Sequence, residues 1–409
     1  MKTRLRPLGL ALAALLAWPA LAAAGLKVEV LDTVKIHESR RYGYFPSLQQ
    51  LSTGELICDF SLNADTDDIE GSFWGYVVST DGGRTWGMRY TGGCIYREAA
   101  YTRDPALPDG SLLMVAGYPL PGPGDDYRNL RATSCRLSDQ GRTARYAWDV
   151  GIRLPQPAAR VKMDVQTDNF AALGPGRIKE AAVMLFSGTM VPARDGGWLT
   201  AMYGKFEGDR GFRTLIVRSG AAGQEWDYVG TVAGDEQTAA ALAREGEPKS
   251  EGFCEPRMVR LPDGRLFIVM RRGSNNRMYR SWSDDEGRTW SDPDSLGFRG
   301  VEPAMMVMRD GTLALSTGRP DAVSVRCSVD GGQTWTDPTP LTRGLENPRP
   351  GLAHASQKST CYTGLVEVEP GRLLVVYDHL PFVEGWGLNP ANEPAALNTI
   401  YGTFVQVTR

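Results

Sequence analysis

The chain has 409 residues and a formal net charge of −3, and it contains 47 glycines and 26 prolines. The slight negative charge argues against nucleic acid as a partner, because proteins that bind nucleic acid carry a basic surface. Few stretches show helical periodicity, and glycine and proline favour tight turns. The composition therefore predicts one all-β domain.

The first 24 residues have the pattern of a secretory signal peptide. A basic start at 1–6 precedes an apolar run at 8–16, and small residues follow at 22–24. A membrane anchor is disfavoured because the apolar stretch is short and is interrupted by Pro19. We therefore predict a mature chain of residues 25–409 that is secreted or periplasmic. No later stretch is apolar enough to span a bilayer.

Strand-like runs separated by turn residues follow in chain order, and we divide them into six units. The units carry their first recognisable strand near residues 45, 104, 164, 255, 302 and 361. A short helix or loop is expected at 235–247, between the third and fourth units. The early strand at 26–31 and the last strand at 400–407 are expected to pair, which would remove an exposed sheet edge.

One eight-residue motif, Ser-x-Asp-x-Gly-x-Thr-Trp, closes several of these units. Good copies stand at 79–86, 283–290 and 328–335, and degenerate versions lie near 139 and 219. Asp can bond the backbone that follows it and start a turn, and Gly takes the positive φ that a tight hairpin needs. Glu255 and Glu302 open two tandem copies of the same unit. A repeat of this length is typical of solenoids, propellers and arrays.

The motif is the Asp-box repeat, and the chain resembles the sialidase-type (BNR) propeller superfamily. The resemblance implies a six-bladed β-propeller with Asp-box turns, in which each blade is a four-stranded antiparallel sheet. Seven blades would require a further blade within 145–200. The innermost strands line a central pocket in such a fold, so residues at their starts face a ligand. Glu255, Glu302 and Tyr362 are expected to occupy this same place in their units.

The resemblance also implies catalytic residues. Tyr362 would be the nucleophile and Glu255 the base that activates it, because a phenol of pKa near 10 is a poor nucleophile alone. A neutral phenol suits an anionic sugar that would repel a carboxylate, and sialidases are the known case. Glu302 repeats the position of Glu255 and is a candidate for substrate binding. Each residue could instead be structural: an ordinary packed aromatic or a carboxylate that bonds backbone.

Arginines are the expected ligands of a substrate carboxylate, because the planar guanidinium meets a carboxylate bidentately. Arg271 follows Glu255 at the spacing that sialidases show. Arg326 is the preferred second member from the fifth unit, with Arg319 and Arg272 as further candidates.

The first unit departs from the family pattern. Sialidases carry an aromatic-Arg-Ile-Pro motif there, whereas this chain has Tyr44 at the position of the Arg. Arg40 or Arg41 could substitute, and Tyr44 itself is a candidate contact. The family's acid/base Asp lies in the following loop, which here offers three candidates: Asp65, Asp67 and Asp68. A general acid near neutral pH needs a raised pKa, which nearby acids could supply.

No metal or other cofactor is expected. The three histidines show no metal-ligand spacing, and no Cys-x-x-Cys or His-Glu-x-x-His occurs. The six cysteines could pair after export, but most lie in strand-like runs where a buried free thiol is equally plausible.

Taken together, the residues and the resemblance predict an exo-glycosidase that hydrolyses terminal sialic-acid-like sugars from glycoconjugates with retention. Two alternatives remain open. One is a propeller glycosidase or lyase that acts on another uronic or neutral sugar, which the loss of the Arg at Tyr44 favours. The other is a propeller that binds carbohydrate without catalysis.

Overall fold

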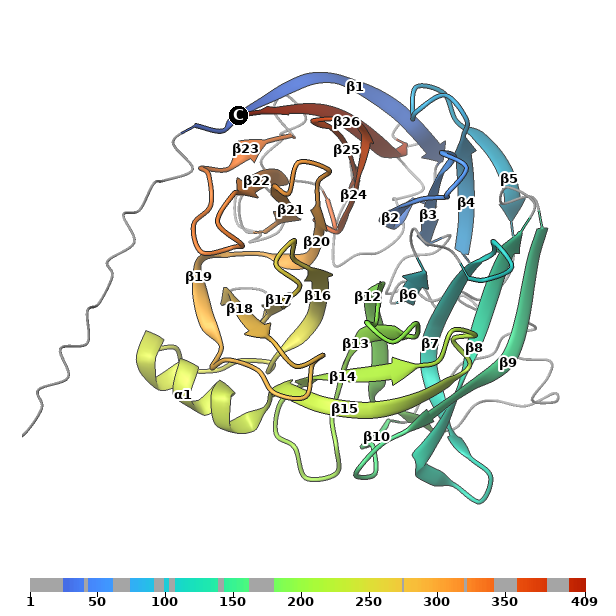
Figure 1. The fold of residues 1–409 in the computed structure, drawn as a ribbon, viewed down its shortest axis with the longest axis vertical. Coiled ribbons are helices and arrows are strands. Elements are labelled where there is room, and N and C mark those ends of the chain that lie inside the picture. Colours follow the sequence, from blue (N-terminus) through green and yellow to red (C-terminus); the bar gives the residue numbers. More distant parts are fainter. Residues whose placement is uncertain are drawn as a thin grey trace, which may run out of the picture.

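The structure is a computed structural model that describes residues 25–39, 43–61, 74–91, 99–102, 107–138, 143–161, 180–273, 276–319, 322–341, 359–380 and 397–409. It is all-β apart from one helix, α1 (Figure 1). The all-β part of the predicted fold class is therefore confirmed. Among the described residues, no helix has the length and apolar character needed to cross a membrane. The signal peptide, with the transmembrane alternative at 8–16, lies outside these ranges. So does the loop within the first unit that carries Asp65, Asp67 and Asp68.

Four sheets have four strands each, and neighbouring strands within them are antiparallel. The first sheet contains β2 (Tyr44–Gln50), β3 (Leu56–Ser61), β4 (Trp74–Ser79) and β5 (Gly87–Thr91). The second contains β16 (Cys254–Arg260), β17 (Leu266–Arg271), β18 (Arg277–Ser283) and β19 (Asp294–Arg299). The third contains β20 (Val301–Val307), β21 (Leu313–Gly318), β22 (Ser324–Ser328) and β23 (Thr339–Pro340). The fourth contains β24 (Thr363–Glu369), β25 (Arg372–His379), β26 (Asn398–Thr408) and β1 (Lys27–Ser39).

Eight further strands form two antiparallel runs of four that are joined to each other. The first run is β6 (Ala99–Thr102), β7 (Leu112–Gly122), β8 (Asp126–Ser138) and β9 (Thr143–Arg153). The second is β12 (Met184–Pro192), β13 (Trp198–Gly204), β14 (Arg213–Ser219) and β15 (Glu225–Ala233). Short parallel pairings of β6 with β12 and of β9 with β15 close these strands into one sheet. A small sheet of β10 (Arg160–Val161) and β11 (Ala181–Ala182) lies beside them. The sheets therefore do not correspond one to one to the six four-stranded blades that were expected.

The sheets are arranged around a common centre (Figure 1). Their first strands form the inner layer, because β12 contacts β16, β16 contacts β20, β20 contacts β24, and β24 contacts β2. Later strands of each sheet lie farther out. Residues at the starts of the first strands therefore meet at one end of the centre, although they are far apart in the sequence.

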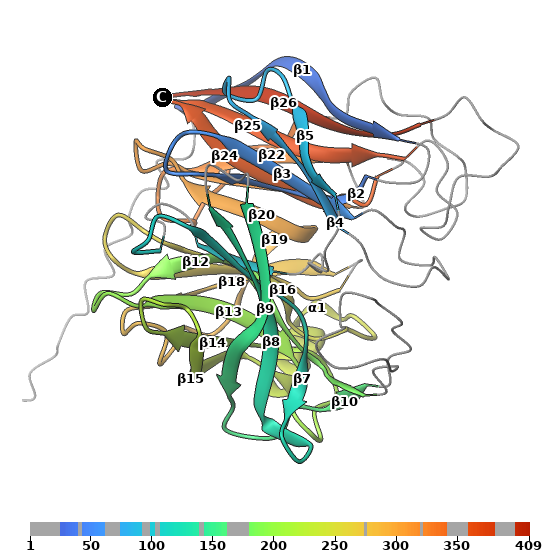
Figure 2. The same cartoon turned by 90° about the vertical axis from the view of Figure 1, so that its right-hand side faces the viewer.

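The two ends of the chain share one sheet, as predicted. Lys27 pairs with Thr408 and Val30 with Val405, so β1 adds to the edge strand β26. Both Figures 1 and 2 show β1 beside β26. This pairing satisfies the backbone groups of β26 that would otherwise form an open edge.

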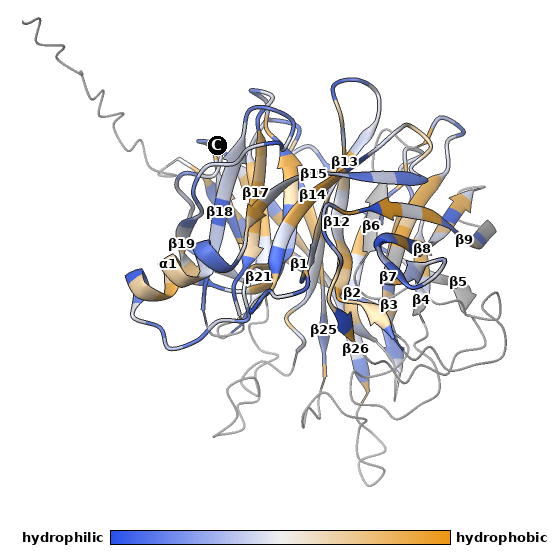
Figure 3. Cartoon of the chain, turned by 90° about the horizontal axis from the view of Figure 1, so that it is seen from below, coloured by the Kyte–Doolittle hydropathy of each residue, from blue (hydrophilic) through white to orange (hydrophobic). Residues whose placement is uncertain are grey.

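The second strand of several sheets is buried along its whole length. Every residue of β3, β13, β17 and β21 is buried. Such strands have neighbouring sheets on both faces, so they are mostly apolar and burial does not alternate along them. Figure 3 shows the hydrophobic colour along β17, whereas many connecting turns are hydrophilic.

The Asp boxes form tight turns held by one carboxylate. In the box at 328–335, Asp330 accepts hydrogen bonds from Ser328 Oγ (2.8 Å), Gln333 N (2.9 Å) and Thr334 N (2.9 Å). The Thr334 hydroxyl also donates to it at 2.5 Å, and Trp335 Nε1 closes the turn on the carbonyl of Gly332 at 3.2 Å. The boxes at 79–86 and 283–290 repeat these contacts.

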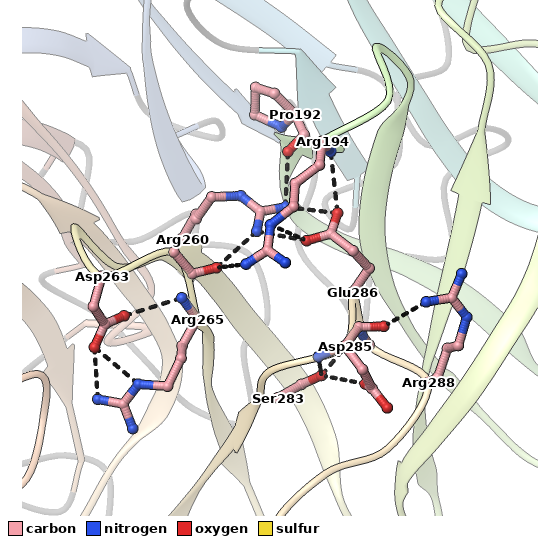
Figure 4. A network of polar contacts seen from close by, with 11 residues as sticks. Pro192, Arg194, Arg260, Asp263, Arg265, Ser283, Asp285, Glu286 and Arg288 are labelled. Carbon is pink, nitrogen blue, oxygen red and sulfur yellow. Dashed lines mark hydrogen bonds and ion pairs between the residues drawn. The ribbon is translucent and has the colours of Figure 1, made fainter.

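One box also ties two sheets together (Figure 4). The carboxylate of Glu286 accepts from the Arg260 guanidinium at 2.7 Å within its own sheet. It also accepts from the backbone N of Arg194 at 3.1 Å, which follows β12 of the neighbouring sheet. The box at 283–290 is therefore both a turn and a contact between sheets.

The helix α1 (Asp235–Glu245) lies where a short helix was expected, between β15 and β16. It starts after Gly234, whose backbone N donates to the Gln237 side chain at 3.0 Å, and ends at Gly246 in the left-handed conformation. The five described cysteines are buried and unbridged: Cys58, Cys135, Cys254, Cys327 and Cys361. No disulfide joins the described residues.

The Asp-box carboxylate makes a testable contribution to stability. Asp330→Ala removes four hydrogen bonds and leaves turn donors without an acceptor, so we expect the free energy of unfolding to fall by about 1–3 kcal/mol. Urea denaturation measures this change. Asp292→Ala, an exposed position outside the box, controls for the lost charge and should change stability little. An equal loss in both variants would contradict this role of the turn.

The boxes also predict acid sensitivity. Partial burial raises the pKa of Asp81, but hydrogen bonds from Thr85, Ser79 and Arg84 outweigh it and lower the pKa to about 2. A carboxyl whose pKa is lowered by folding stabilises the protein above its unfolded value of about 3.9, and this contribution disappears as the pH falls through the folded value. We expect the free energy of unfolding to decrease between about pH 4 and pH 2. The decrease should be smaller in Asp81→Asn, which has no carboxyl to protonate at this position. An unchanged pH profile in this variant would show that Asp81 does not cause the acid sensitivity.

Candidate active site

The starts of the first strands share an unusual backbone conformation. Phe45, Glu255 and Glu302 have φ values of 54°, 44° and 31°, and each precedes a proline. The strand pairing is shifted at each of these points, as in a β-bulge. Proline lacks the N–H that a regular ladder requires, so a bulge accommodates it. Positive φ costs a residue other than glycine about 1–2 kcal/mol, and such strain collects at functional sites.

In the last sheet, Cys361 has this conformation, with φ of 66°. Tyr362 therefore lies one position beyond the place of Glu255 and Glu302, and the expected equivalence of these three residues is corrected. The strand pairing supports this alignment of the two sheets. Thr363 stands two residues after Cys361 and pairs with β25, and Arg257 stands two residues after Glu255 and pairs with β17.

Glu255, Tyr362 and Arg271 meet at the centre, as the sequence predicted. The Tyr362 hydroxyl lies 2.5 Å from Glu255 Oε1, and the Arg271 guanidinium pairs with the same oxygen. The other oxygen of Glu255 accepts from the backbone N of Glu302 at 2.8 Å. The three side chains are nearly buried: Glu255 is 4% exposed, Tyr362 7% and Arg271 8%.

A second carboxylate, which the sequence reasoning missed, holds Arg271. Glu251 lies 3.0 Å from its guanidinium. Burial lowers the pKa of Arg271, but the charge of Glu255 and its neighbours raises it more, so the net shift is upward and the guanidinium stays charged. Arg272 is fully buried and pairs instead with Glu245 (2.6 Å) and with Glu247. Glu251 lies outside the repeated motif, so no sequence pattern indicated it.

The two further candidate arginines lie in different places. Arg319, at the end of β21, is 8% exposed and donates to the Thr360 carbonyl at 3.0 Å. Arg326, in the third strand of the same sheet, stacks over the Phe298 ring at 4.2 Å. Arg319 therefore contacts the segment that carries Tyr362, whereas Arg326 lies farther out.

Glu302 is engaged by a residue that was not predicted. Arg257 donates to Glu302 Oε1 at 2.8 Å and to the Pro303 carbonyl at 2.8 Å. These contacts join β16 to β20. The proposed substrate-binding role of Glu302 stays a prediction, but its observed contact is with Arg257.

Asp378 at the end of β25 holds the backbone around Tyr362. It accepts from Ser359 Oγ (2.7 Å), Thr360 N (2.8 Å) and Thr360 Oγ1 (2.6 Å), and from Phe45 N in the first sheet (3.0 Å). Phe45 packs edge-on against Tyr362, with 5.0 Å between ring centroids. Burial raises the pKa of Asp378 and outweighs the donors, which lower it.

Tyr44 is 1% exposed and belongs to the hydrophobic core. Its role in substrate binding stays a prediction. The other candidates of the first unit lie outside the described residues: Arg40, Arg41, Asp65, Asp67 and Asp68. Among the described residues, no group of three or more His, Cys, Asp or Glu side chains is placed to hold a metal ion.

Residues 148–373 match the BNR repeat-like domain. The match covers more than half of the chain, which therefore belongs to the BNR repeat-like family. No curated protein matches it.

Several solved structures share the fold at low sequence identity. A protein of unknown function from Dyadobacter fermentans is 17% identical with a TM-score of 0.61, over 93% of this chain and 99% of that one. A Hadza microbial sialidase is 17% identical with a TM-score of 0.57, over 83% of this chain and 63% of that one. A Penicillium chrysogenum α-L-arabinanase complexed with arabinobiose is 14% identical with a TM-score of 0.55, over 92% and 98%. This likeness shows the fold alone.

Replacement of Asp378 tests whether its hydrogen bonds hold the backbone around Tyr362 in place. Asp378→Asn places an amide N–H where the carboxylate accepted from donors including Phe45 N, so a buried donor loses its acceptor. We expect the free energy of unfolding to fall by about 2–3 kcal/mol. Urea denaturation tests this, with Asp32→Asn in the exposed part of β1 as the matched control. A change no larger than that of the control would show that Asp378 does not hold this backbone.

Proposed function

We propose that the protein is a retaining exo-glycosidase of sialidase type, with Tyr362 as nucleophile and Glu255 as its base. The observation that carries this proposal is the 2.5 Å contact between the Tyr362 hydroxyl and Glu255, both of which are nearly buried. A nucleophile and its base within hydrogen-bond reach, with the base oriented by a third group, is the pattern of covalent catalysis. Arg271 is that third group.

The proposed reaction has two steps. Glu255 takes the phenol proton while the Tyr362 oxygen forms a bond to the anomeric carbon, and the glycosidic C–O bond breaks. A loop acid among Asp65, Asp67 and Asp68 gives its proton to the leaving oxygen. In the second step the same loop carboxylate takes a proton from water, whose oxygen bonds to the anomeric carbon as the tyrosyl–sugar bond breaks. Glu255 returns its proton to the Tyr362 oxygen, and the configuration is retained. Arg271 pairs with the Glu255 oxygen that the Tyr362 hydroxyl contacts, and so it orients the carboxylate toward the phenol.

Arg271 and Arg319 are the proposed ligands of a substrate carboxylate. Arg319 contacts the segment that carries Tyr362 and comes from the neighbouring sheet, so it suits this role better than Arg326. Two guanidinium groups favour an acidic sugar such as sialic acid.

A glycosidase for a different sugar is the second candidate. Tyr44 and Phe45 occupy the start of β2, where a third arginine would be expected, and Arg271 is already paired with Glu255 and Glu251. Both observations reduce the capacity for a carboxylate. The fold is compatible with either substrate, because the similar structures include both a sialidase and an arabinanase.

We further propose a six-bladed propeller, in which β6–β9 and β12–β15 are two blades joined by their parallel contacts. Export of the mature chain 25–409 to the periplasm or the medium is part of the same proposal. Terminal sugars of extracellular glycoconjugates are then the accessible substrates.

Turnover of a fluorogenic N-acetylneuraminic acid glycoside tests the function. We expect the wild type to release the fluorophore and Tyr362→Phe to lose at least about 10³-fold in kcat, because no other group supplies the nucleophile. Glu255→Gln should lose about 10²–10⁴-fold.

Tyr377→Phe is the matched control. Its hydroxyl lies 3.2 Å from the Leu341 carbonyl in the core, away from Glu255, so activity should change little. If the wild type fails to cleave the sialic acid glycoside but cleaves an arabinoside or uronide, the second candidate replaces the first. No turnover of any of these glycosides would leave the carbohydrate-binding alternative.

A further inference from the structure

A cationic groove lies between the sheet of β16–β19 and the sheet of β20–β23. Its volume is about 510 Å³. Four arginines line it: Arg277, Arg299, Arg319 and Arg326. None of the lining residues that the structure describes is an Asp or Glu. Such a concentration of one charge attracts anions to a concave surface.

Two of these arginines are placed against each other. Arg277 and Arg299 are direct cross-strand partners in β18 and β19, and both are exposed. Like charges directly opposite each other in an antiparallel pair destabilise a sheet. Neither forms an ion pair with a carboxylate among the described residues. An anion bound between the two guanidinium groups would remove this repulsion.

The third arginine is held in a fixed position. Arg326 stacks on the Phe298 ring at 4.2 Å and lies 3.3 Å from Ser324 Oγ. Contact of the guanidinium with an aromatic face restricts its motion. A guanidinium restrained in this way loses less entropy when it binds an oxyanion.

The inner end of the groove reaches the candidate active site. Gly318 and Arg319 form this end. A Cβ atom at Gly318 would lie 2.7 Å from Cβ of Cys361, which directly precedes Tyr362. Arg319 also contacts the Thr360 carbonyl. The strand register places the starts of β18 and β22 at the same end of the sheets as Glu255 and Glu302.

We propose that this groove binds a carboxylate or sulfate group on a second sugar, linked to the sugar that Tyr362 attacks. The preferred substrate would then be a glycan with two anionic groups rather than a singly charged one. The inference rests on the proposed function in one respect: that function determines which of the two linked sugars Tyr362 attacks. The anion site itself rests only on the groove.

Binding of small probes tests the site without turnover. Galactose 6-sulfate, glucuronic acid and neutral galactose are each titrated into the full chain and followed by saturation-transfer NMR. We expect at least one anionic probe to bind about tenfold more tightly than galactose, as one or two charge-assisted hydrogen bonds provide. The comparison of the two anionic probes distinguishes sulfate from carboxylate.

Arg277→Gln/Arg299→Gln is the test variant, and Arg128→Gln/Arg145→Gln, at exposed positions in β8 and β9, is the control of equal charge. The preference for the anionic probe should disappear in the first and persist in the second. Thermal unfolding should show that the first variant is folded, because the change removes a like-charge contact.

Several outcomes would overturn the site. The wild type could show no preference for either anionic probe, the test variant could retain the preference, or both variants could lose it equally through their net charge. Failure of the proposed function is separate. It would appear as absent turnover of the fluorogenic glycoside while the arginine-dependent preference for the anionic probe persists.

Discussion

The carboxylate of Glu255 joins three sheets at the centre of the molecule. It accepts from Tyr362 of the last sheet, from Arg271 of its own sheet and from the backbone of Glu302 in the next sheet. A carboxylate that is 4% exposed would be costly if it lacked these partners. The contacts therefore require the three sheets to stand in one relative position, and the same contacts orient Glu255 toward the phenol.

Hydrogen bonds from surrounding side chains to the backbone, in addition to apolar packing, hold this arrangement in place. Asp378 fixes Thr360 and Phe45 on two sides of Tyr362, and Arg257 joins the starts of β16 and β20. The strained positive-φ residues stand in the same region. Rigid sheets can support such strain because the ring is closed by β1 and β26, which leaves the inner strands little freedom to relax. A site built in this way is organised before substrate arrives.

Charge is distributed unevenly around the centre. Glu251 and Glu255 both face Arg271, so the guanidinium nearest to Tyr362 is neutralised within the protein. In the groove, Arg277 and Arg299 form no ion pair with a carboxylate in the part of the chain that the structure describes. Attraction for an anionic glycan would therefore come mainly from the groove, which includes Arg319, whereas the centre supplies the reacting groups. This division separates the steering of a charged ligand from the chemistry at the anomeric carbon.

The sequence by itself determined the features that local chemistry controls. An Asp box is a turn whose hydrogen bonds span four residues, so its eight letters were enough to place it, and the repeat of Glu255 and Glu302 indicated tandem sheets. The helix at 235–245, the pairing of the chain ends and the meeting of Glu255, Tyr362 and Arg271 were also predictable, the last through the family resemblance. Only the tertiary structure decided that Arg319, rather than Arg326, contacts the segment that carries Tyr362. It also decided that Glu251 pairs with Arg271 and Arg257 with Glu302, and that Tyr362 lies one residue after the positive-φ position. The physical reason is distance along the chain: Asp378 bonds Phe45 across 333 residues and Tyr362 bonds Glu255 across 107, and no local pattern records such contacts.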